Sequence, residues 1–382
     1  MTQSDGAGGA ARAALRLLAC FLSTDIDAKM LVVSKSTNKD EVLKISGLLR
    51  IKSSIYSRID KYFCAYVMPN CREWKTSGLF GVVSAKSLNA SEFDTINLHW
   101  IGHGLISLNQ VNKVRKRIIW TLHDEWIIEG PAHYGVKTHD VKKTFYLPLR
   151  KTILRFFMRF SESQRKTLVS NPNVVFIPVS SEIKKKFLAK YPNAESRVHV
   201  IPNALDTSFF HPTEQLVRKL PIVLFLGGDR DPRKGWDLLR QACLQGTKPY
   251  NLIIPGSKLN GMIGKINITG IPKIDNPRIL HKYLSNADVV VVPSRAEALP
   301  QVATEAISCG TPVVSFNVGG LPDIVIENHT GVLVNQFNTK EFSEAIDKVL
   351  MQGKIFYSHR CRKFALKNFS FPSISKRYQV LI

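Results

Sequence analysis

Several features that narrow the class of a protein are absent from this sequence. It contains no run of about eighteen apolar residues, so no membrane-spanning helix is predicted. Its six cysteines form no Cys-x-x-Cys pair and are spaced too widely for a zinc knuckle, and a chain this long needs no disulfide framework. We therefore expect reduced thiols and a cytoplasmic protein. No repeat of about 20–50 residues is visible, which argues against solenoids.

The sequence also contains fewer acidic than basic residues. Asp and Glu total 30 against 53 Lys and Arg, which gives the 382-residue chain a formal net charge of +23. Such a charge favours polyanionic partners: nucleic acid, an anionic membrane surface or a phosphate-bearing substrate. Hydrophobic residues make up 44% of the chain, enough for buried cores, and the length predicts two domains.

Short apolar, β-branched runs recur along the chain. Gly, Pro, Asn or Asp bounds each run, and helix-length segments separate most of them. This alternation predicts βαβ units and parallel sheets, an α/β fold. The predicted strands are Thr95–Ile101, Arg117–Leu122, Val174–Val179, Ile222–Leu226, Asn251–Ile254, Val289–Val292, Pro312–Phe316 and Gly331–Val334. A boundary at Ile201–Asp206, followed by a polar stretch, places the domains at 1–205 and 206–365.

The most basic segments lie in the first half, at 112–117, 150–160 and 184–186. In the second of these, Arg or Lys recurs about every four residues, and Ile, Leu and Phe fill the spaces between. This pattern indicates a basic amphipathic helix, which suits an anionic lipid surface. A surface helix that packs its Phe face on the core has the same pattern, so both interpretations stay open.

Two glutamates eight residues apart give the densest chemical signal. The predicted strand 289–292 ends at Pro293, a loop presents Glu297, and a short helix carries Glu305 and ends at Gly310. The N-terminus of that helix would lie at the carboxyl edge of a parallel sheet, where its amide dipoles favour an anion such as a diphosphate. Glu305 would accept hydrogen bonds from a ribose diol, and Glu297 would reach the group beyond the phosphates. The alternative is two solvated surface carboxylates.

The residues around these glutamates resemble the nucleotide-sugar site of retaining GT-B glycosyltransferases of the family 4 type. In that family the region reads glutamate, seven residues, Glu-Ala-x-Ala-x-Gly-x-Pro-Val-Val, and later Gly-Gly-x-x-Glu. This chain has Glu297, then Glu305-Ala-Ile-Ser-Cys-Gly-Thr-Pro-Val-Val, then Gly319-Gly-Leu-Pro-Asp323. The segment 226–235, which contains Arg-Lys-Gly, is similar to the family's Arg/Lys loop, and 201–206 to its interdomain junction.

Segments of the first half are similar to the bacterial exopolysaccharide branch, which includes colanic-acid-type enzymes. They are Leu98-His99-Trp100-Ile101, Thr121-Leu-His123-Asp124-Glu-Trp126 and Pro131-Ala-His133-Tyr134. The resemblance implies a GT-B fold: two Rossmann-like doubly wound domains that face each other across a cleft. It further implies that the first domain binds the acceptor and the second the nucleotide sugar, and that a C-terminal helix over 366–382 returns to the first domain.

The resemblance also implies a site. The expected nucleotide-sugar-binding residues are Gly8, Gly9, Arg230, Arg233, Lys234, Glu297, Leu299, Pro300, Gln301, Val302 and Glu305. The expected catalytic residues are His123, Arg233, Lys234 and Glu297. The basic loop and a helix N-terminus can stabilise a departing diphosphate, so we expect no metal and no cofactor, with a UDP- or GDP-linked sugar as substrate. Many relatives have Arg where this chain has Asp229, which leaves open which arginine meets the phosphate.

The histidines and glycines of the first half keep alternative interpretations. His123 follows a predicted strand and would bond the donor sugar or the acceptor, or it is a structural residue. His99 and His103 have the spacing of a metal pair, but the glycines around them indicate a loop. Gly8 and Gly9 would let backbone amides approach the reacting phosphate, or they belong to a flexible tail.

The start of the chain departs from the family pattern. The segment 4–9 resembles the glycine-rich loop that follows the family's first strand, but the three residues before it do not supply the expected apolar strand. We therefore expect either that the start site is misplaced or that the first strand is missing, and an inactive, truncated relative is one alternative.

The function expected from these features is transfer of a sugar, with retention, from a nucleotide-diphosphate sugar to a glycan or a polyprenyl-diphosphate-linked acceptor in polysaccharide biosynthesis. The enzyme would be cytoplasmic or peripheral at the inner face of the plasma membrane. A nucleotide-sugar 2-epimerase of the same architecture is the other enzyme to consider. A nucleic-acid partner is not expected, since no helix-turn-helix, zinc-finger or aromatic RNA-binding signature is present.

Overall fold

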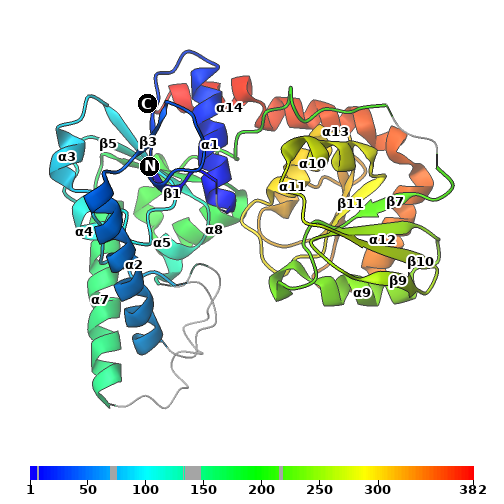
Figure 1. The fold of residues 1–382 in the computed structure, drawn as a ribbon, viewed down its shortest axis with the longest axis horizontal. Coiled ribbons are helices and arrows are strands. Elements are labelled where there is room, and N and C mark those ends of the chain that lie inside the picture. Colours follow the sequence, from blue (N-terminus) through cyan, green and yellow to red (C-terminus); the bar gives the residue numbers. More distant parts are fainter. Residues whose placement is uncertain (7, 69–74, 132, 134–147, 215–217) are drawn as a thin grey trace. The chain divides into compact units, whose positions relative to one another are not determined.

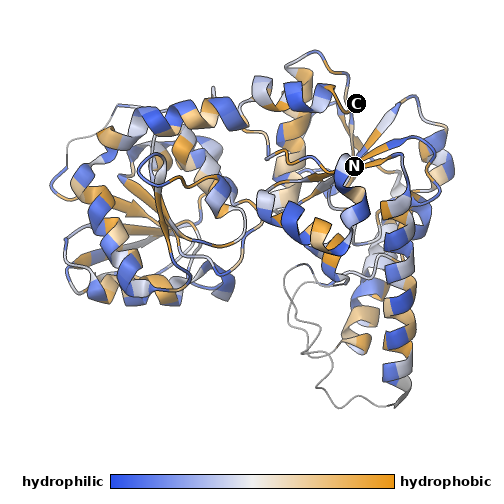
Figure 2. Ribbon diagram, turned by 180° about the vertical axis from the view of Figure 1, so that it is seen from behind, coloured by the Kyte–Doolittle hydropathy of each residue, from blue (hydrophilic) through white to orange (hydrophobic). Residues whose placement is uncertain are grey.

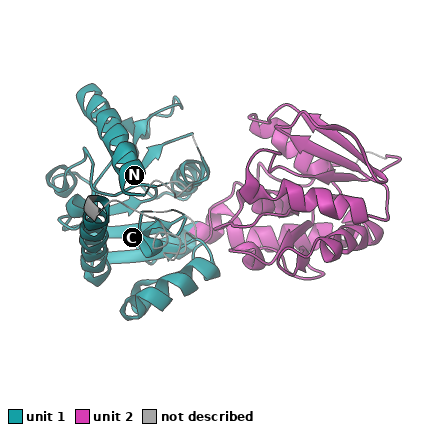
Figure 3. Ribbon diagram, turned by 90° about the horizontal axis from the view of Figure 1, so that it is seen from below, with its two compact units in different colours: residues 1–201, 375–382 teal, residues 202–374 magenta. Residues whose placement is uncertain are grey.

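The chain divides into two compact units, which are described separately. The computed structural model describes residues 1–382 except 7, 69–74, 132, 134–147 and 215–217. The first unit comprises Met1–Ile201 with Ser375–Ile382, and the second comprises Pro202–Ile374 (Figure 3). The second unit thus begins inside the segment 201–206 that the sequence marks as a boundary. In the part of the chain that is described, no helix is both long and apolar enough to cross a bilayer.

Parallel strands of the first unit form two three-stranded sheets, ordered β1-β2-β3 and β4-β5-β6. The His99 amide, just after β4, donates to the Met1 carbonyl, just before β1, at 3.0 Å. The resulting order 3-2-1-4-5-6 is that of a doubly wound Rossmann-like unit, and the chain directions diverge between β1 and β4. The strands are β1 (Thr2–Ser4), β2 (Met30–Ser34), β3 (Val42–Lys44), β4 (Thr95–Leu98), β5 (Arg117–Leu122) and β6 (Val174–Pro178).

Strand β1 corrects the expectation that the first strand is missing. Thr2 pairs with Val32 and Ser4 with Ser34, in parallel register. Parallel pairing needs backbone amides and carbonyls rather than a long apolar run, and of the three residues only Thr2 is buried. The missing strand was the reason to consider an inactive relative, and the structure removes that reason.

Helices accompany the sheets of the first unit, as Figure 1 shows. Buried Ala14 and Leu18 of α1 pack on Met30, Val32 and Val42 of β2 and β3. Strands β5 and β6 are mostly apolar (Figure 2), and all of their residues except Arg117 are buried, as expected where helices cover a parallel sheet. The helices are α1 (Gly9–Leu22), α2 (Gly47–Val67), α3 (Ala85–Asn89), α4 (Leu108–Val111), α5 (Trp126–Glu129), α7 (Pro148–Ser170), α8 (Ser181–Lys190) and the 3₁₀ helix η1 (Pro192–Arg197).

The second unit contains one seven-stranded sheet, ordered β13-β12-β11-β7-β8-β10-β9. All of its pairs are parallel except β9 with β10. After β7 the chain continues to β8 on one side of the sheet, and after β11 it continues to β12 on the other side. The neighbouring strands β7 and β11 therefore mark the point where the chain changes its direction of progress through the sheet. The strands are β7 (Ile222–Leu224), β8 (Asn251–Pro255), β9 (Asn260–Ile263), β10 (Ile266–Ile271), β11 (Val289–Val292), β12 (Val313–Phe316) and β13 (Gly331–Val334).

The helices of this part of the chain end with two that run to the C-terminus. They are η2 (Pro232–Lys234), α9 (Trp236–Gln245), α10 (Pro277–Asn286), α11 (Gln301–Ser308), η3 (Leu321–Asp323), α12 (Thr339–Gln352), α13 (Lys354–Phe369) and α14 (Phe371–Gln379). The Arg362 guanidinium of α13 donates to the Ser308 carbonyl at 3.1 Å and to the Phe210 carbonyl at 2.8 Å. Since these contacts hold α13 in the second unit, the return to the first unit begins at Ser375 rather than at 366.

Candidate functional site

Two loops of the second unit meet beyond the carboxyl ends of the neighbouring strands β7 and β11. The loop after β7 leads into η2, and the loop after β11 leads from Pro293 to the start of α11. Lys234 joins them, because its Nζ donates to Glu297 Oε1 at 2.6 Å. The Ser294 hydroxyl donates to the same oxygen at 2.9 Å. Two residues that the sequence singled out, 63 positions apart, therefore lie together at the edge where the chain directions diverge.

Backbone geometry fixes this junction. Gly235 has a φ of 74°, and a Cβ there would lie 2.0 Å from the Pro293 carbonyl oxygen, so only glycine fits. Arg295 holds the same loop, since its amide donates to the Arg233 carbonyl at 2.7 Å. The Arg295 guanidinium also forms two hydrogen bonds with the Asp237 carboxylate, at 2.8 and 2.5 Å, which lower the pKa of Asp237. Sequence reasoning missed Arg295, although its place in the loop that follows a buried strand was a usable signal.

The three cations of the β7 loop have different surroundings. Lys234 is held at Glu297, whereas Arg233 Nη2 donates to Asp231 Oδ2 at 2.7 Å. Burial alone would raise the pKa of Asp231, but the hydrogen bonds from Arg233 outweigh it and lower that pKa. Arg230 is exposed. Asp229, which stands where many relatives have an arginine, accepts a hydrogen bond from the Ser257 hydroxyl at 3.0 Å.

Helix α11 carries the remaining residues predicted for the second unit. Leu299 and Pro300 are buried just before it, and half-buried Gln301 and Val302 begin it. Glu305 lies one turn further, with a relative exposure of 4%. The N-terminal end of α11, which carries partial positive charge, thus follows directly on the loop of Glu297.

A third loop, after β12, supports the backbone of Glu297. Gly319 has a φ of 54°, and a Cβ there would lie 1.6 Å from the Glu297 carbonyl oxygen. The Gly320 amide donates to the same oxygen at 3.4 Å. Asp323, which stands where the family has a glutamate, lies half-buried in η3. The Gly-Gly pair of the resemblance therefore has a packing role at Glu297.

In the first unit, His123 follows β5 and pairs with a second histidine. His123 Nε2 lies 2.8 Å from Nδ1 of His99, which follows β4. Burial lowers the pKa of both imidazoles, to about 4 for His123. Both rings are thus neutral at pH 7 and can share one N–H between them. The sequence did not predict this pairing, because it links the ends of two different strands.

A second polar pair lies beside the first. His133 Nδ1 is 2.6 Å from Asp124 Oδ2, and the indole of Trp126 lies nearly parallel to the His133 ring. Both pairs line a small cavity of about 20 Å³, close to the volume that one water molecule needs. Its other lining residues are Thr76, Trp100, Ile101, Gly102, Trp120, Thr121, Leu122, Trp126 and Ile127. Tyr134, which the resemblance also included, lies outside the described residues.

The structure separates His99 from His103. His103 Nδ1 lies 3.2 Å from the Ser57 hydroxyl, whereas His99 is paired with His123. Among the residues described, no three His, Cys, Asp or Glu side chains are grouped so that they could hold a metal ion. His99 and His103 therefore do not form the ligand pair that their spacing allows.

Gly8 and Gly9 lie at the start of α1, in the loop that follows β1. Both are exposed, and Gly8 has a φ of 89°. The loop is anchored by Asp5, whose carboxylate accepts four hydrogen bonds of 2.7–2.9 Å from the amides and hydroxyls of Ser36 and Thr37. Asp5, which sequence reasoning did not single out, thus ties the loop of the two glycines to the loop after β2.

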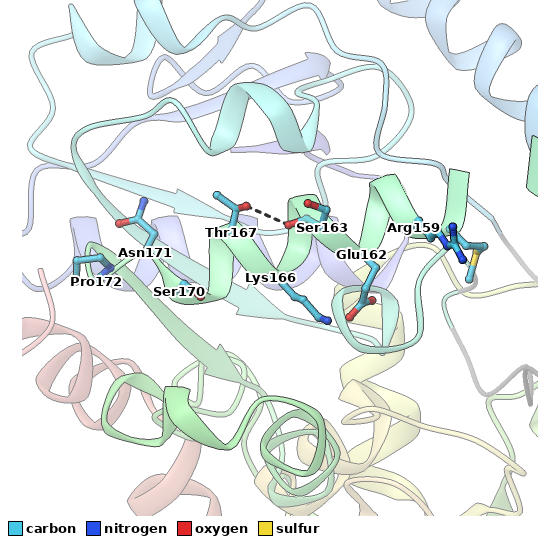
Figure 4. Close-up of a pocket in the computed structure, with 9 residues that line it drawn as sticks. Arg159, Glu162, Ser163, Lys166, Thr167, Ser170, Asn171 and Pro172 are labelled. Carbon is cyan, nitrogen blue, oxygen red and sulfur yellow. Dashed lines mark hydrogen bonds between the residues drawn. The ribbon is translucent and has the colours of Figure 1, made fainter. Parts of the chain in front are cut away.

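An open groove along α7 has a different character (Figure 4). Its lining includes Arg159, Glu162 and Lys166, and none of the predicted site residues. Glu162 accepts hydrogen bonds from Lys190 at 3.1 Å and from Arg165 at 3.2 Å. The acid of this groove is therefore already engaged with basic residues of the first unit.

Comparison with known proteins identifies both halves of the chain. Residues 7–209, more than half of the chain, match the model of Glycosyltransferase Family 4, and residues 207–367 match that of Glycosyl transferases group 1. An uncharacterized 41.2 kDa protein in the cps region of Klebsiella pneumoniae is 26% identical over 77% of this chain and 79% of its own length. The D-inositol 3-phosphate glycosyltransferase of Mycobacterium sp. strain JLS is 29% identical over 46% of this chain, and the match spans only 44% of that enzyme.

Solved structures show the same architecture. HepE of Anabaena, in complex with UDP, aligns over 100% of this chain and 97% of its own, with a TM-score of 0.57 and 16% identity. The sucrose-phosphate synthase of Thermosynechococcus elongatus aligns over 100% of this chain and 94% of its own, with a TM-score of 0.62 and 20% identity. With two doubly wound units, the fold is GT-B. The relatives named for an activity are glycosyltransferases, so the comparisons do not favour the epimerase alternative. The chain is a glycosyltransferase and belongs to Glycosyltransferase Family 4.

Proposed function

We propose that this enzyme transfers a sugar from a UDP- or GDP-linked donor to a glycan or a polyprenyl-diphosphate-linked acceptor, with retention of the anomeric configuration and without a metal ion. The single observation that carries the donor assignment is the contact of Lys234 with Glu297. It joins the loops after β7 and β11 where open α/β sheets bind ligands. HepE, a GT-B neighbour, binds UDP and UDP-glucose, which supports a nucleotide-sugar donor here.

In this proposal the second unit stabilises the leaving group. When the bond between the sugar C1 and the phosphate oxygen breaks, the diphosphate carries away the electron pair and gains negative charge. Lys234, with Arg233 or Arg230, and the N-terminus of α11 would balance that charge. Each charge-assisted hydrogen bond contributes about 1.5–3 kcal/mol, so these groups can lower the barrier substantially. Glu297 keeps the Lys234 ammonium in place, and Glu305 is proposed to accept hydrogen bonds from the ribose.

The first unit would supply the residues around the sugar and its acceptor. His123 and His99 are neutral at pH 7, because burial lowers their pKa values, so each can donate or accept a hydrogen bond without carrying a charge. Gly8 and Gly9 are exposed at the start of α1, where backbone amides can meet a phosphate. We assign His123 to a hydroxyl of the donor sugar or of the acceptor.

The relative from Klebsiella pneumoniae is described as lying in a cps region, which supports a role in polysaccharide biosynthesis. The high net charge suits an anionic membrane and a diphosphate-linked lipid acceptor. We therefore propose that the enzyme works at the inner face of the plasma membrane as a peripheral protein.

A transfer assay tests this function. The full-length enzyme is incubated with a panel of UDP- and GDP-sugars, with polyprenyl-diphosphate-linked and free glycan acceptors, and with EDTA. The proposal predicts release of one nucleoside diphosphate together with a retained glycosidic linkage, seen by NMR. Glu297→Gln should lower kcat about 100-fold, whereas Glu344→Gln, an exposed change in the same unit, should leave it unchanged. Isomerised donor formed without acceptor, or equal kcat for Glu297→Gln, would contradict it.

A further inference from the structure

Helix α2 exposes a continuous apolar stripe to solvent. Its members recur at spacings of three, four or seven residues over five turns, on the side opposite the buried Ser53, Asp60 and Cys64. The stripe consists of Leu48, Ile51, Ile55, Ile59, Tyr62 and Tyr66, with relative exposures of 83, 58, 50, 43, 74 and 40%. We call it the α2 stripe. Most helices of a folded unit bury their apolar face, whereas α2 leaves its apolar stripe exposed to solvent.

The charges that flank the α2 stripe have one sign. Exposed cations on the helix are Arg50, Lys52, Arg58 and Lys61. The only acid within α2 is Asp60, which is buried and accepts a hydrogen bond from the Ser77 amide at 3.0 Å. The solvent face of α2 is therefore apolar along its centre and purely cationic at its margins.

Helix α7 lies against α2 (Figure 1). The rings of Phe63 and Phe157 meet at 5.1 Å, and the Arg150 guanidinium lies over the Tyr66 ring at 4.6 Å. Up to Phe160, α7 contains four cations, Arg150 among them, and no acid, and it leaves Phe156 73% exposed. Phe157 is buried, as packing on the core requires, whereas Phe156 is exposed to solvent. Core packing therefore accounts for one ring of this segment and leaves the other at the surface.

We infer that the α2 stripe and the adjoining basic turns of α7 form one docking surface for an anionic lipid bilayer. An in-plane helix of this kind buries apolar side chains at the boundary of headgroups and acyl chains, while its cations meet the anionic headgroups. Tyr62 and Tyr66 have the amphipathic rings that favour this depth. With 21 residues, α2 provides about 30 Å of contact along the membrane.

Self-association through the same stripe is less favourable. A second copy would bring the flanking cations of two α2 helices together, with no exposed acid on either helix to pair with them. An anionic surface instead neutralises these cations. Charge complementarity therefore selects the membrane as the occupant.

This inference rests on the proposed function, because it names the surface of the chain that would contact the membrane. It does not involve the residues of the transfer reaction. The donor residues Lys234 and Glu297 belong to the second unit, while the α2 stripe belongs to the first. Vesicle binding is measured without any sugar nucleotide, so a failure of docking and a failure of the proposed reaction are seen in different experiments.

The test is flotation of the full-length protein with two kinds of vesicle: phosphatidylcholine alone, and phosphatidylcholine mixed with the anionic lipid phosphatidylglycerol. The expected result is binding to the anionic vesicles that weakens in 1 M salt. Arg58→Glu with Lys61→Glu should weaken partitioning at least about thirtyfold, since each cation near the surface contributes about fivefold. The matched control is Arg278→Glu with Lys282→Glu, two exposed cations on helix α10 of the second unit.

The apolar part is tested by a second matched pair. Ile55→Ser should weaken binding about tenfold. Ile279→Ser on α10, at 47% exposure against 50% for Ile55, should leave it unchanged. Circular dichroism verifies that all variants fold. The inference would be overturned if the α2 and α10 variants bound vesicles equally well. It would also be overturned if wild type bound both kinds of vesicle equally, or bound neither. A dimer in sedimentation that Ile55→Ser dissociates would assign the stripe to a second copy instead.

Discussion

Asp5 is an example of one buried carboxylate that holds two loops. Burial alone would raise its pKa, but the hydrogen bonds from Ser36 and Thr37 lower it from 3.8 to about 2. A group whose pKa is lower in the folded protein stabilises it above the unfolded pKa, and this contribution is lost as the pH falls. The loop of Gly8 and Gly9 should therefore be most sensitive to acid between about pH 4 and pH 2.

Asp5→Asn tests this at the residue scale. Because the amide nitrogen of Asn cannot accept, the donors of either Ser36 or Thr37 lose their acceptor, so we expect a loss of about 2–3 kcal/mol in the free energy of unfolding at pH 7. The difference from wild type should shrink from pH 4 to pH 2 in urea titrations. Asp40→Asn, at an exposed position nearby, is the control and should change little. A constant difference across this pH range would show that the carboxylate charge is not what holds the loop.

Glu305→Ala makes a second prediction at this scale. If its carboxylate accepts hydrogen bonds from the ribose, the Kd for the nucleotide should rise about tenfold or more in calorimetric titration. The parallel change Glu341→Ala, on α12, should leave the Kd as it is. An unchanged Kd for Glu305→Ala would refute the ribose assignment.

At the scale of secondary-structure elements, the η2 turn requires glycine at position 235. Gly235→Ala places a Cβ 2.0 Å from the Pro293 carbonyl oxygen at a φ of 74°. We expect a loss of at least about 3 kcal/mol of stability in thermal unfolding, together with loss of turnover. Gly256→Ala is the matched control: its φ is 82° but nothing lies within 4 Å of a Cβ, so it should cost only about 1–2 kcal/mol. If Gly235→Ala and Gly256→Ala lost equal stability, backbone strain alone would explain the effect, and the contact with the β11 loop would contribute nothing.

The elements also show which features a sequence reveals. All eight predicted strands are present, because buried parallel strands are continuous apolar runs such as Val289–Val292. The short strands β1 and β3 were not predicted, since three residues such as Thr2–Ser4 carry no periodic signal. Lys234 and Glu297 were chosen from the motifs, but their contact depends on strand order, as does that of His99 with His123. The α2 stripe was missed because its apolar spacing looks the same whether it faces a core or solvent.

For the whole molecule, the C-terminal segment returns to the first unit. The Tyr378 ring meets Phe21 at 5.3 Å, and its hydroxyl lies 3.3 Å from that of Thr121. Tyr378→Ala should therefore cost about 3–5 kcal/mol. Hydrogen exchange should accelerate in α1 and β5 rather than in the second unit. Val380→Ala, at 79% exposure, is the control. Faster exchange confined to 202–374 would contradict this assignment.

The central claim is that the chain holds its donor nucleotide at the junction of Lys234 and Glu297. It is tested most directly by calorimetric titration of the full-length protein with UDP and GDP in EDTA, using wild type, Lys234→Ala and Lys282→Ala. The account predicts that wild type and the exposed control Lys282→Ala bind one of the two nucleotides alike, and that Lys234→Ala binds it at least about tenfold more weakly. Equal affinity for all three proteins, or no binding of either nucleotide by folded wild type, would contradict it.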